Sequence, residues 1–184
     1  MAQRATIFKV ELSIADMDRN YYGDHSLTIA RHPSETDERM MVRVLAFALH
    51  AHERLEFGRG LSTEDEPDLW LRDLTGAIER WIDVGLPDEP ALRKACGRAR
   101  HVDVLAYGGR AVDLWWQGVG ERLERQERLT VNEVPADASK ALAALVGRTM
   151  KLQVTIQDRH IYVAEGMSSV ALELRTLKAA GPRP

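Results

Sequence analysis

The chain has 184 residues and a formal net charge of −3, with 45% hydrophobic and 29% charged residues. This mixture is typical of a globular domain and excludes a disordered, collagen-like or disulfide-stapled chain. The single cysteine, Cys96, cannot form an internal disulfide, and no apolar run reaches the roughly 20 residues that a membrane helix needs. We therefore expect a cytoplasmic protein that does not enter a membrane and that would need a local basic patch or a metal ion to bind a polyanion.

The first elements predicted along the chain are a hairpin and a helix. Apolar and polar residues alternate strictly over residues 6–15, which predicts a half-buried strand; a polar turn over 16–24 and a returning strand over 27–30 follow. Ser34 is the expected N-cap of a helix whose apolar stripe runs to about Leu55. His50 and His52 are two residues apart and point about 200° apart on that helix, which excludes a zinc-protease pair and favours positions at its rim.

The middle and the end of the chain alternate between strands and helices. Strands over 68–72 and 78–84 are expected to form a hairpin across Thr75 and Gly76, and Asp88 is the expected N-cap of a second helix. The stretch 112–116 suggests a strand, with a helix as the alternative. The remaining predictions are strands over 102–107 and 129–134, a helix over 138–146, and strands around 152–156, 161–163 and 170–174. These elements predict an α+β (mixed α/β) fold, with one mixed β-sheet and flanking helices in a single compact domain over residues 1–180 and a tail over 181–184.

A group of carboxylates is expected at one end of the 68–84 hairpin. Asp68 opens the first strand after Pro67 and Asp83 ends the second, so antiparallel pairing brings the two together, while Glu79 is expected on the same face as Asp83. Clustered carboxylates need a compensating charge, and oxygen ligands favour Mg²⁺ or Mn²⁺. The predicted metal ligands are Asp68, Asp83, Glu79 and Glu53.

Such a cluster is typical of metal-dependent phosphodiester cleavage. Nucleases that use it carry Pro-Asp on one strand and an acidic residue, any residue and lysine on the next, but Gly85 stands here at the lysine position. Lys94 on the following helix is the candidate replacement, and Arg93 and Arg98 beside it are candidates for nucleic-acid contacts. The structural alternatives are a solvated acidic loop at Asp68, a turn prepared by Asp83, and a solvated helix face around Lys94. The predicted catalytic residues are Asp68, Asp83, Glu79 and Lys94.

Several ordered blocks of this sequence resemble the YaeQ family over nearly the whole chain. They are Ala5-Thr6-Ile7, the block 27–61 with Ala30-Arg31-His32-Pro33-Ser34-Glu35-Thr36, Asp65-Glu66-Pro67, Trp81-Ile82-Asp83-Val84-Gly85-Leu86-Pro87-Asp88-Glu89, Lys94-Ala95, Trp115-Trp116, Arg148-Thr149-Met150 and Thr155-Ile156-Gln157-Asp158. The resemblance implies a compact variation on the PD-(D/E)XK nuclease fold, with extra N- and C-terminal strands, in which the nuclease-like positions fall on Asp68, Asp83 and Glu79.

Two functional hypotheses follow from these residues. The first is a Mg²⁺-dependent nuclease or phosphodiesterase that acts on nucleic acid. The second is a catalytically inactive module of the nuclease fold that binds protein or RNA, which is favoured by Gly85, by the negative net charge and by the lack of an evident aromatic stacking platform.

Overall fold

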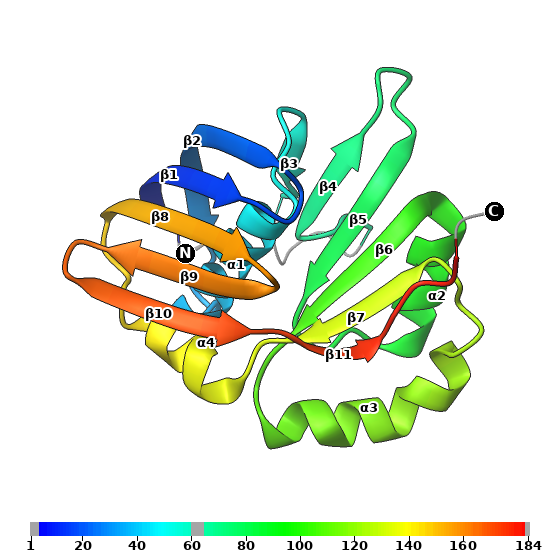
Figure 1. Cartoon of the computed structure of the whole chain (residues 1–184). Helices are drawn as coiled ribbons and strands as arrows, with labels where there is room; N and C mark the ends of the chain where they lie inside the picture. Colours follow the sequence, from blue (N-terminus) through cyan, green and yellow to red (C-terminus); the bar gives the residue numbers. More distant parts are fainter. Residues whose placement is uncertain (1–3, 60–64, 183–184) are drawn as a thin grey trace.

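Eleven strands and four helices make up the part of the chain that the structure describes, residues 4–59 and 65–182 of a computed structural model (Figure 1). The strands are β1 (Thr6–Asp16), β2 (Tyr21–Arg31), β3 (Leu55–Phe57), β4 (Leu69–Arg72), β5 (Ile78–Val84), β6 (Ala99–Ala106), β7 (Leu129–Glu133), β8 (Thr149–Gln157), β9 (His160–Glu165), β10 (Ser168–Glu173) and β11 (Arg175–Lys178). The helices are α1 (Asp37–Leu49), α2 (Glu89–Arg98), α3 (Arg110–Leu123) and α4 (Ala136–Ala143). None of these helices is long and apolar enough to cross a membrane.

The strands form two mixed sheets rather than the one that the sequence predicts. The first sheet has the order β10-β9-β8-β1-β2 and the second has the order β11-β7-β6-β5-β4-β3. In the first sheet only β1 and β8 are parallel, whereas β5, β6 and β7 are parallel in the second. Leu174 alone separates β10 from β11, so the chain passes from one sheet directly into the other (Figure 1). The fold is a compact α+β domain.

One hydrophobic core joins the two sheets through α1. The nine consecutive residues from Met40 to Ala48 are all buried, so this helix is covered on every side and not along one stripe only. The inward residues of β1, such as Leu12, and the residues Leu69 and Ile82 of the second sheet belong to the same cluster. A second cluster fills the other face of the second sheet, where α2 and α3 pack; it contains Trp81, Leu92 and Val112.

Several element boundaries differ from the sequence-based predictions for local reasons. The turn after β1 is short, so β2 begins at Tyr21. Thr36 caps α1 instead of Ser34, with its hydroxyl accepting the Arg39 N–H at 3.1 Å, and α1 ends at Leu49 because the chain turns to form β3. Asp88 caps α2 as predicted. The predicted tail is described to Pro182 only, and within it the Gly181 N–H donates to the Glu127 carbonyl at 2.8 Å.

The stretch 112–116 lies in α3, which confirms the helical alternative and makes the strand interpretation wrong there. Leu114 is exposed while Val112 is buried, so their apparent alternation reflects one buried and one exposed side of a helix. The short edge strands β3 and β11 were missed because three or four residues carry little periodicity.

Ile82 tests whether the shared core holds the two sheets together. Its side chain is fully buried between the second sheet and α1. We expect Ile82→Ala to lower the free energy of unfolding by about 2–5 kcal/mol, because the truncation leaves a cavity that rigid neighbours cannot fill. Urea denaturation measures this loss. Leu74→Ala is the matched control, since Leu74 is 93% exposed and its truncation leaves the stability unchanged within about 0.5 kcal/mol.

Candidate functional site

Asp68 and Asp83 lie side by side where the second sheet meets α1. Leu69 pairs with Ile82 in the antiparallel β4–β5 register, which places Asp68 and Asp83 at the same end of the hairpin. The Asp68 carboxylate accepts the Val84 N–H at 2.7 Å, and the Asp68 N–H donates in turn to the Asp83 carboxylate. Each acid therefore fixes the other through the backbone.

Arg39 supplies the counter-charge to this pair. Its Nη2 lies 2.7 Å from Asp68 Oδ1, while its Nη1 lies 3.2 Å from Glu35 Oε1. The Arg39 side chain is only 17% exposed. Burial alone would lower its pKa, but the Asp68 and Glu35 carboxylates outweigh burial and raise the pKa above the ordinary value. The guanidinium is thus firmly charged and bound between two acids.

Glu35 extends the contact into the first sheet. It forms a bidentate pair with Arg43, with Nε at 2.7 Å and Nη2 at 2.8 Å, and both side chains are nearly fully buried. Arg43 also donates to the Ala30 carbonyl of β2 at 3.2 Å. Four charged residues, Glu35, Arg39, Arg43 and Asp68, therefore connect β2, α1 and the β4–β5 hairpin; we call them the junction network.

The carboxyl group of Asp83 has a raised pKa. Burial is the main cause that raises its pKa to about 6, and the neighbouring Asp68 charge adds to this. The Trp81 Nε1–H donates to Asp83 Oδ2 at 2.9 Å and partly offsets the shift.

The other predicted site residues lie away from this pair. The register of β4 and β5 shifts at Glu79, and this bulge turns the Glu79 side chain to the face that carries Arg80, so the expectation that Glu79 and Asp83 share a face is wrong. Glu79 lies 3.9 Å from Arg54 instead. Glu53 is exposed in a groove between β2 and β3.

The predicted basic residues occupy the exposed side of α2. Lys94 is 63% exposed and forms an ion pair with Asp65. Arg93 pairs with Glu89 at 2.6 Å, and Arg98 lies over the Trp81 ring at 5.1 Å while donating to the Asp65 carbonyl at 2.9 Å. Each of these side chains therefore already contacts the protein's own acids, rings or carbonyls.

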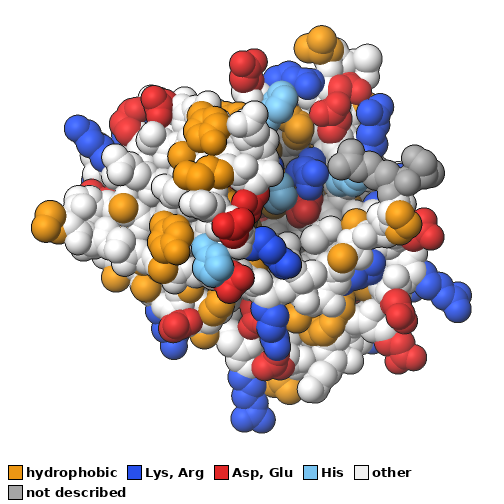
Figure 2. Space-filling model, viewed as in Figure 1, with side chains coloured by type: hydrophobic (Ala, Val, Ile, Leu, Met, Phe, Trp, Pro, Cys, Tyr) orange, Lys and Arg blue, Asp and Glu red, His pale blue; other side chains and the backbone are white. Residues whose placement is uncertain are grey.

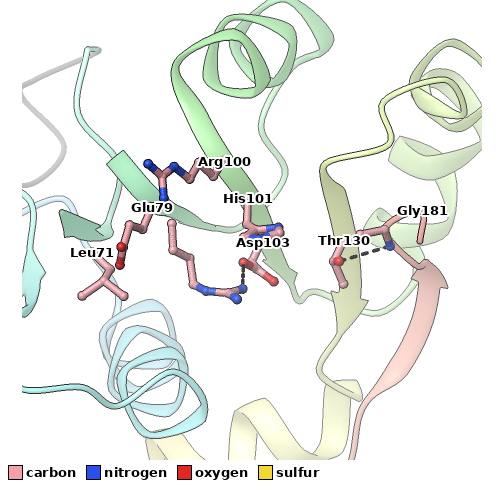
Figure 3. Close-up of a pocket in the computed structure, with 9 residues that line it drawn as sticks. Leu71, Glu79, Arg100, His101, Asp103, Thr130 and Gly181 are labelled. Atoms are coloured by element: carbon pink, nitrogen blue, oxygen red, sulfur yellow. Dashed lines mark hydrogen bonds and ion pairs between the residues drawn. The ribbon is translucent and has the colours of Figure 1, made fainter. Parts of the chain in front are cut away.

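A second polar site lies in the cleft between the two sheets. Figure 2 shows the hollow between the two halves of the molecule with basic, histidine and acidic side chains inside it. One part of it has a volume of about 440 Å³, and Figure 3 shows Glu79, Arg100, His101, Asp103 and Thr130 around it. Asp103 is 9% exposed and forms an ion pair with Arg80.

His50 lies close to Asp103 of this cleft. Its Nε2 lies 4.0 Å from Asp103 Oδ1. Burial lowers the pKa of His50 to about 4 despite the nearby carboxylate, so the ring is neutral near pH 7. Asp103 is consequently neutralised by Arg80 and not by His50.

Comparison with known proteins gives the relatives of this chain. A family model described as "YaeQ protein" matches residues 1–174. The chain belongs to the YaeQ family. It is 45% identical over 174 residues to the "Uncharacterized protein YaeQ" of Salmonella typhi, and the alignment covers 95% of this chain and 96% of the relative. The protein of the same description from Escherichia coli K12 is 44% identical over 174 residues, with the same coverage of both chains.

Two solved YaeQ structures are closely similar. The YaeQ protein from Xanthomonas axonopodis pv. citri superimposes with a TM-score of 0.92 at 51% identity, covering 97% of this chain and 99% of that one. The YaeQ protein from Pseudomonas syringae gives 0.91 at 37% identity, covering 95% and 97%. The family resemblance read from the sequence is confirmed.

The acid pair of this YaeQ chain is poorly suited to a divalent cation. Both Asp68 oxygens are bound, one by Arg39 and one by the Val84 N–H, so the guanidinium occupies the position at which a cation would bind. Burial raises the pKa of Asp83 to about 6, so below that pH a cation would have to displace the proton from this carboxyl. Among residues 4–59 and 65–182 no group of three histidine, cysteine or acidic side chains could hold a metal ion.

The glycine at the expected lysine position has a backbone role in the YaeQ fold. Gly85 adopts a φ of +108°, which a lysine side chain would strain, and its N–H donates to the Leu105 carbonyl at 3.0 Å. Asp103 was not singled out by sequence analysis, although a carboxylate inside the apolar run 102–107 is a signal that could have identified it.

The raised pKa of Asp83 predicts a pH-dependent stability difference. The pKa of Asp83 is near 4 in the unfolded chain and about 6 in the folded chain. Between these two pH values the unfolded chain has lost a proton that the folded chain keeps. The contribution of Asp83 to stability therefore falls as the pH rises. Two pKa units correspond to about 3 kcal/mol. We expect Asp83→Asn to be more stable than the natural chain by up to about that amount above pH 7, and to gain little below pH 4.

Urea denaturation of both chains at pH 4 and pH 8 measures this difference. His50 titrates in the opposite sense, because its lowered pKa removes stability as the pH falls from about 6.5 to about 4. His50 is the same in both chains, so its effect cancels in the comparison. A stability difference that is equal at the two pH values would contradict the assignment to Asp83.

Proposed function

We propose that this YaeQ family member is a binding module that holds a protein partner and does not hydrolyse phosphodiesters. The observation that carries the proposal is the contact of Arg39 with Asp68, because a fixed guanidinium supplies the charge that a catalytic cation would supply in a nuclease. The order α1, β4–β5 hairpin, α2 and β6 supports a relationship to the PD-(D/E)XK nuclease fold, and shared architecture is compatible with lost chemistry.

A protein partner is favoured over RNA by the balance of charge. Arg80 and Arg100 of the inter-sheet cleft lie beside two carboxylates, Glu79 and Asp103, and the whole chain is acidic. Nucleic-acid interfaces instead gather an excess of lysine and arginine, which releases counterions from the phosphates. Binding of a single-stranded RNA at 150 mM salt would therefore count against a protein partner.

A Mg²⁺-dependent nuclease or phosphodiesterase is the second candidate. It is favoured by the direct contact between Asp68 and Asp83, the two acids at the nuclease-like positions. The two candidates differ in how the protein responds to divalent cations.

The response to Mn²⁺ or Mg²⁺ discriminates between them. We expect millimolar concentrations of either ion to leave the melting temperature of the natural chain unchanged within about 1 °C, because Arg39 already neutralises Asp68. Arg39→Ala leaves buried carboxylates without a counter-charge and should lower stability by about 3–5 kcal/mol. The same ions should then raise the melting temperature of this variant measurably. A cation-dependent rise in the natural chain that Asp68→Ala removes would favour the nuclease.

Cleavage assays test the activity directly. We expect the purified chain to leave single- and double-stranded DNA and RNA intact in the presence of Mg²⁺ or Mn²⁺. Cation-dependent cutting that is lost in Asp83→Ala but kept in Leu74→Ala would overturn the binding-module proposal, whereas cutting that persists in Asp83→Ala comes from a contaminant.

A further inference from the structure

β2 is an unusually long and regular edge strand. It ends the first sheet and pairs with β1 over eleven consecutive residues without a register shift. Edge strands of natural proteins are normally short, bulged, covered, or protected by lysine or proline, because an open edge pairs with other chains. β2 contains neither lysine nor proline, and its charged residues Asp24 and Arg31 lie outside the stretch 25–30.

The other three sheet edges carry such protection. β3 has only three residues, and β11 has four residues with a register shift and carries Arg175 and Lys178. β10 is six residues long, and α4 packs against its buried residues in the shared core. Among the sheet edges in the described part of the chain β2 is thus the longest, and its pairing runs without a register shift.

The hydrogen-bonding groups on the open side of β2 follow from the neighbouring strands. The Lys9 and Met17 N–H groups donate to β8 or to the residue before it, at 2.9 and 2.8 Å, so the odd-numbered residues of β1 face β8. The even-numbered residues of β1 then bond to β2, and Leu12 lies opposite His25. In an antiparallel ladder this directs the N–H and C=O groups of Ser26 and Thr28 away from the sheet.

A groove of about 510 Å³ adjoins this open edge. It lies between β2 and β3, which are neighbours in Figure 1, and both Ser26 and Thr28 line it. Its floor is aromatic: the His25 ring packs on Phe47 with centroids 5.0 Å apart, and Phe47 stacks on Phe57 at 5.6 Å. The groove therefore combines backbone donors and acceptors on one wall with an apolar floor.

We propose that an extended segment of a partner protein binds in this groove and adds to β2 as a further strand. The proposal rests on the proposed function as a protein-binding module and names where the partner binds. β3 bounds the opposite side of the groove, so a segment that pairs with β2 there lies between the two strands. Alternate apolar side chains of the segment cover the half-buried rings of His25 and Phe57, which line the groove above the buried Phe47.

Charge at the rim indicates the composition of the segment. Glu53 lines the groove and forms no ion pair with any residue in the described ranges, whereas Glu56 is already paired with Arg72 at 3.0 Å. A lysine or arginine between the apolar positions of the segment therefore meets an acid whose charge is available.

A labelled octapeptide, Lys-Val-Thr-Val-Lys-Val-Thr-Val, tests the groove by fluorescence anisotropy on the full chain. We expect saturable binding, with at least a tenfold loss when the central amides of the peptide are N-methylated, since N-methylation removes the donors that pair with an edge. Glu53→Gln should weaken binding two- to fivefold. No saturation up to millimolar protein, or equal binding of the N-methylated peptide, would overturn the proposal.

Ser26→Pro tests the edge from the side of the protein. Proline removes an outward N–H and leaves the hydrogen bonds to β1 intact, so the variant should fold. Its affinity for the peptide should be at least tenfold lower than that of the natural chain. Ser26→Ala is the matched control, because it removes only the hydroxyl contact with Glu11 and should bind as the natural chain does. If Ser26→Pro does not fold, amide exchange of the natural chain tests instead whether the peptide binds to the β2 edge.

Amide exchange reports the same edge residue by residue. The amides of Ser26 and Thr28 should exchange rapidly in the free chain and become protected by the peptide, while those of His25 and Leu27 are protected throughout. Protection of Ser26 and Thr28 in the free chain together with dimer formation would assign the edge to a second copy and overturn the proposal. A failed peptide experiment leaves the outcome of the Mn²⁺ measurements unaffected, so the two proposals fail separately.

Discussion

The junction network places four ionised side chains where the two sheets and α1 meet. Glu35 and Arg43 are almost completely buried, so their desolvation is offset only because each charged atom has a close partner. Arg43 bonds to the backbone of β2 and Arg39 bonds to Asp68 beside β5. Apolar packing alone would permit several angles between the sheets, whereas these directional contacts require one arrangement of α1 relative to both.

The same network determines what the acid pair can do chemically. In a metal-dependent nuclease two neighbouring carboxylates share a cation, and the repulsion between them is removed by that ion. Here Asp68 shares a guanidinium with Glu35, and burial raises the pKa of Asp83 to about 6. Two acids close together are therefore compatible with a structural role, and geometry alone does not make them a catalytic centre.

Local sequence patterns predicted those parts of the molecule that depend on neighbouring residues. The hairpin of β4 and β5, the cap at Asp88 and the contact of Asp68 with Asp83 follow from alternation, capping chemistry and antiparallel pairing. Long-range features could not be predicted in this way. The bulge at Glu79 changes the side of the strand to which this side chain points, and no sequence signal marks it. Arg39 contacts Asp68 although it lies 29 residues earlier in the chain.

The division into two sheets was hidden for a similar reason. Leu174 separates β10 from β11, and nothing in the residues around it shows that the chain changes sheets at that point. His50 follows α1 as its C-cap and Asp103 belongs to β6, so the two side chains come together only once the second sheet has packed on the helix.

The pairing of β1 with β8 has a consequence for how the protein is made. Lys9 lies beside Thr149, so β1 has to wait for a segment 140 residues later in the chain before its second edge is paired. Contacts of such sequence separation slow folding, because a long loop must close before they form. Until β8 is made, the hairpin of β1 and β2 therefore has an unpaired edge on each of its two strands, and such edges make folding intermediates prone to aggregate.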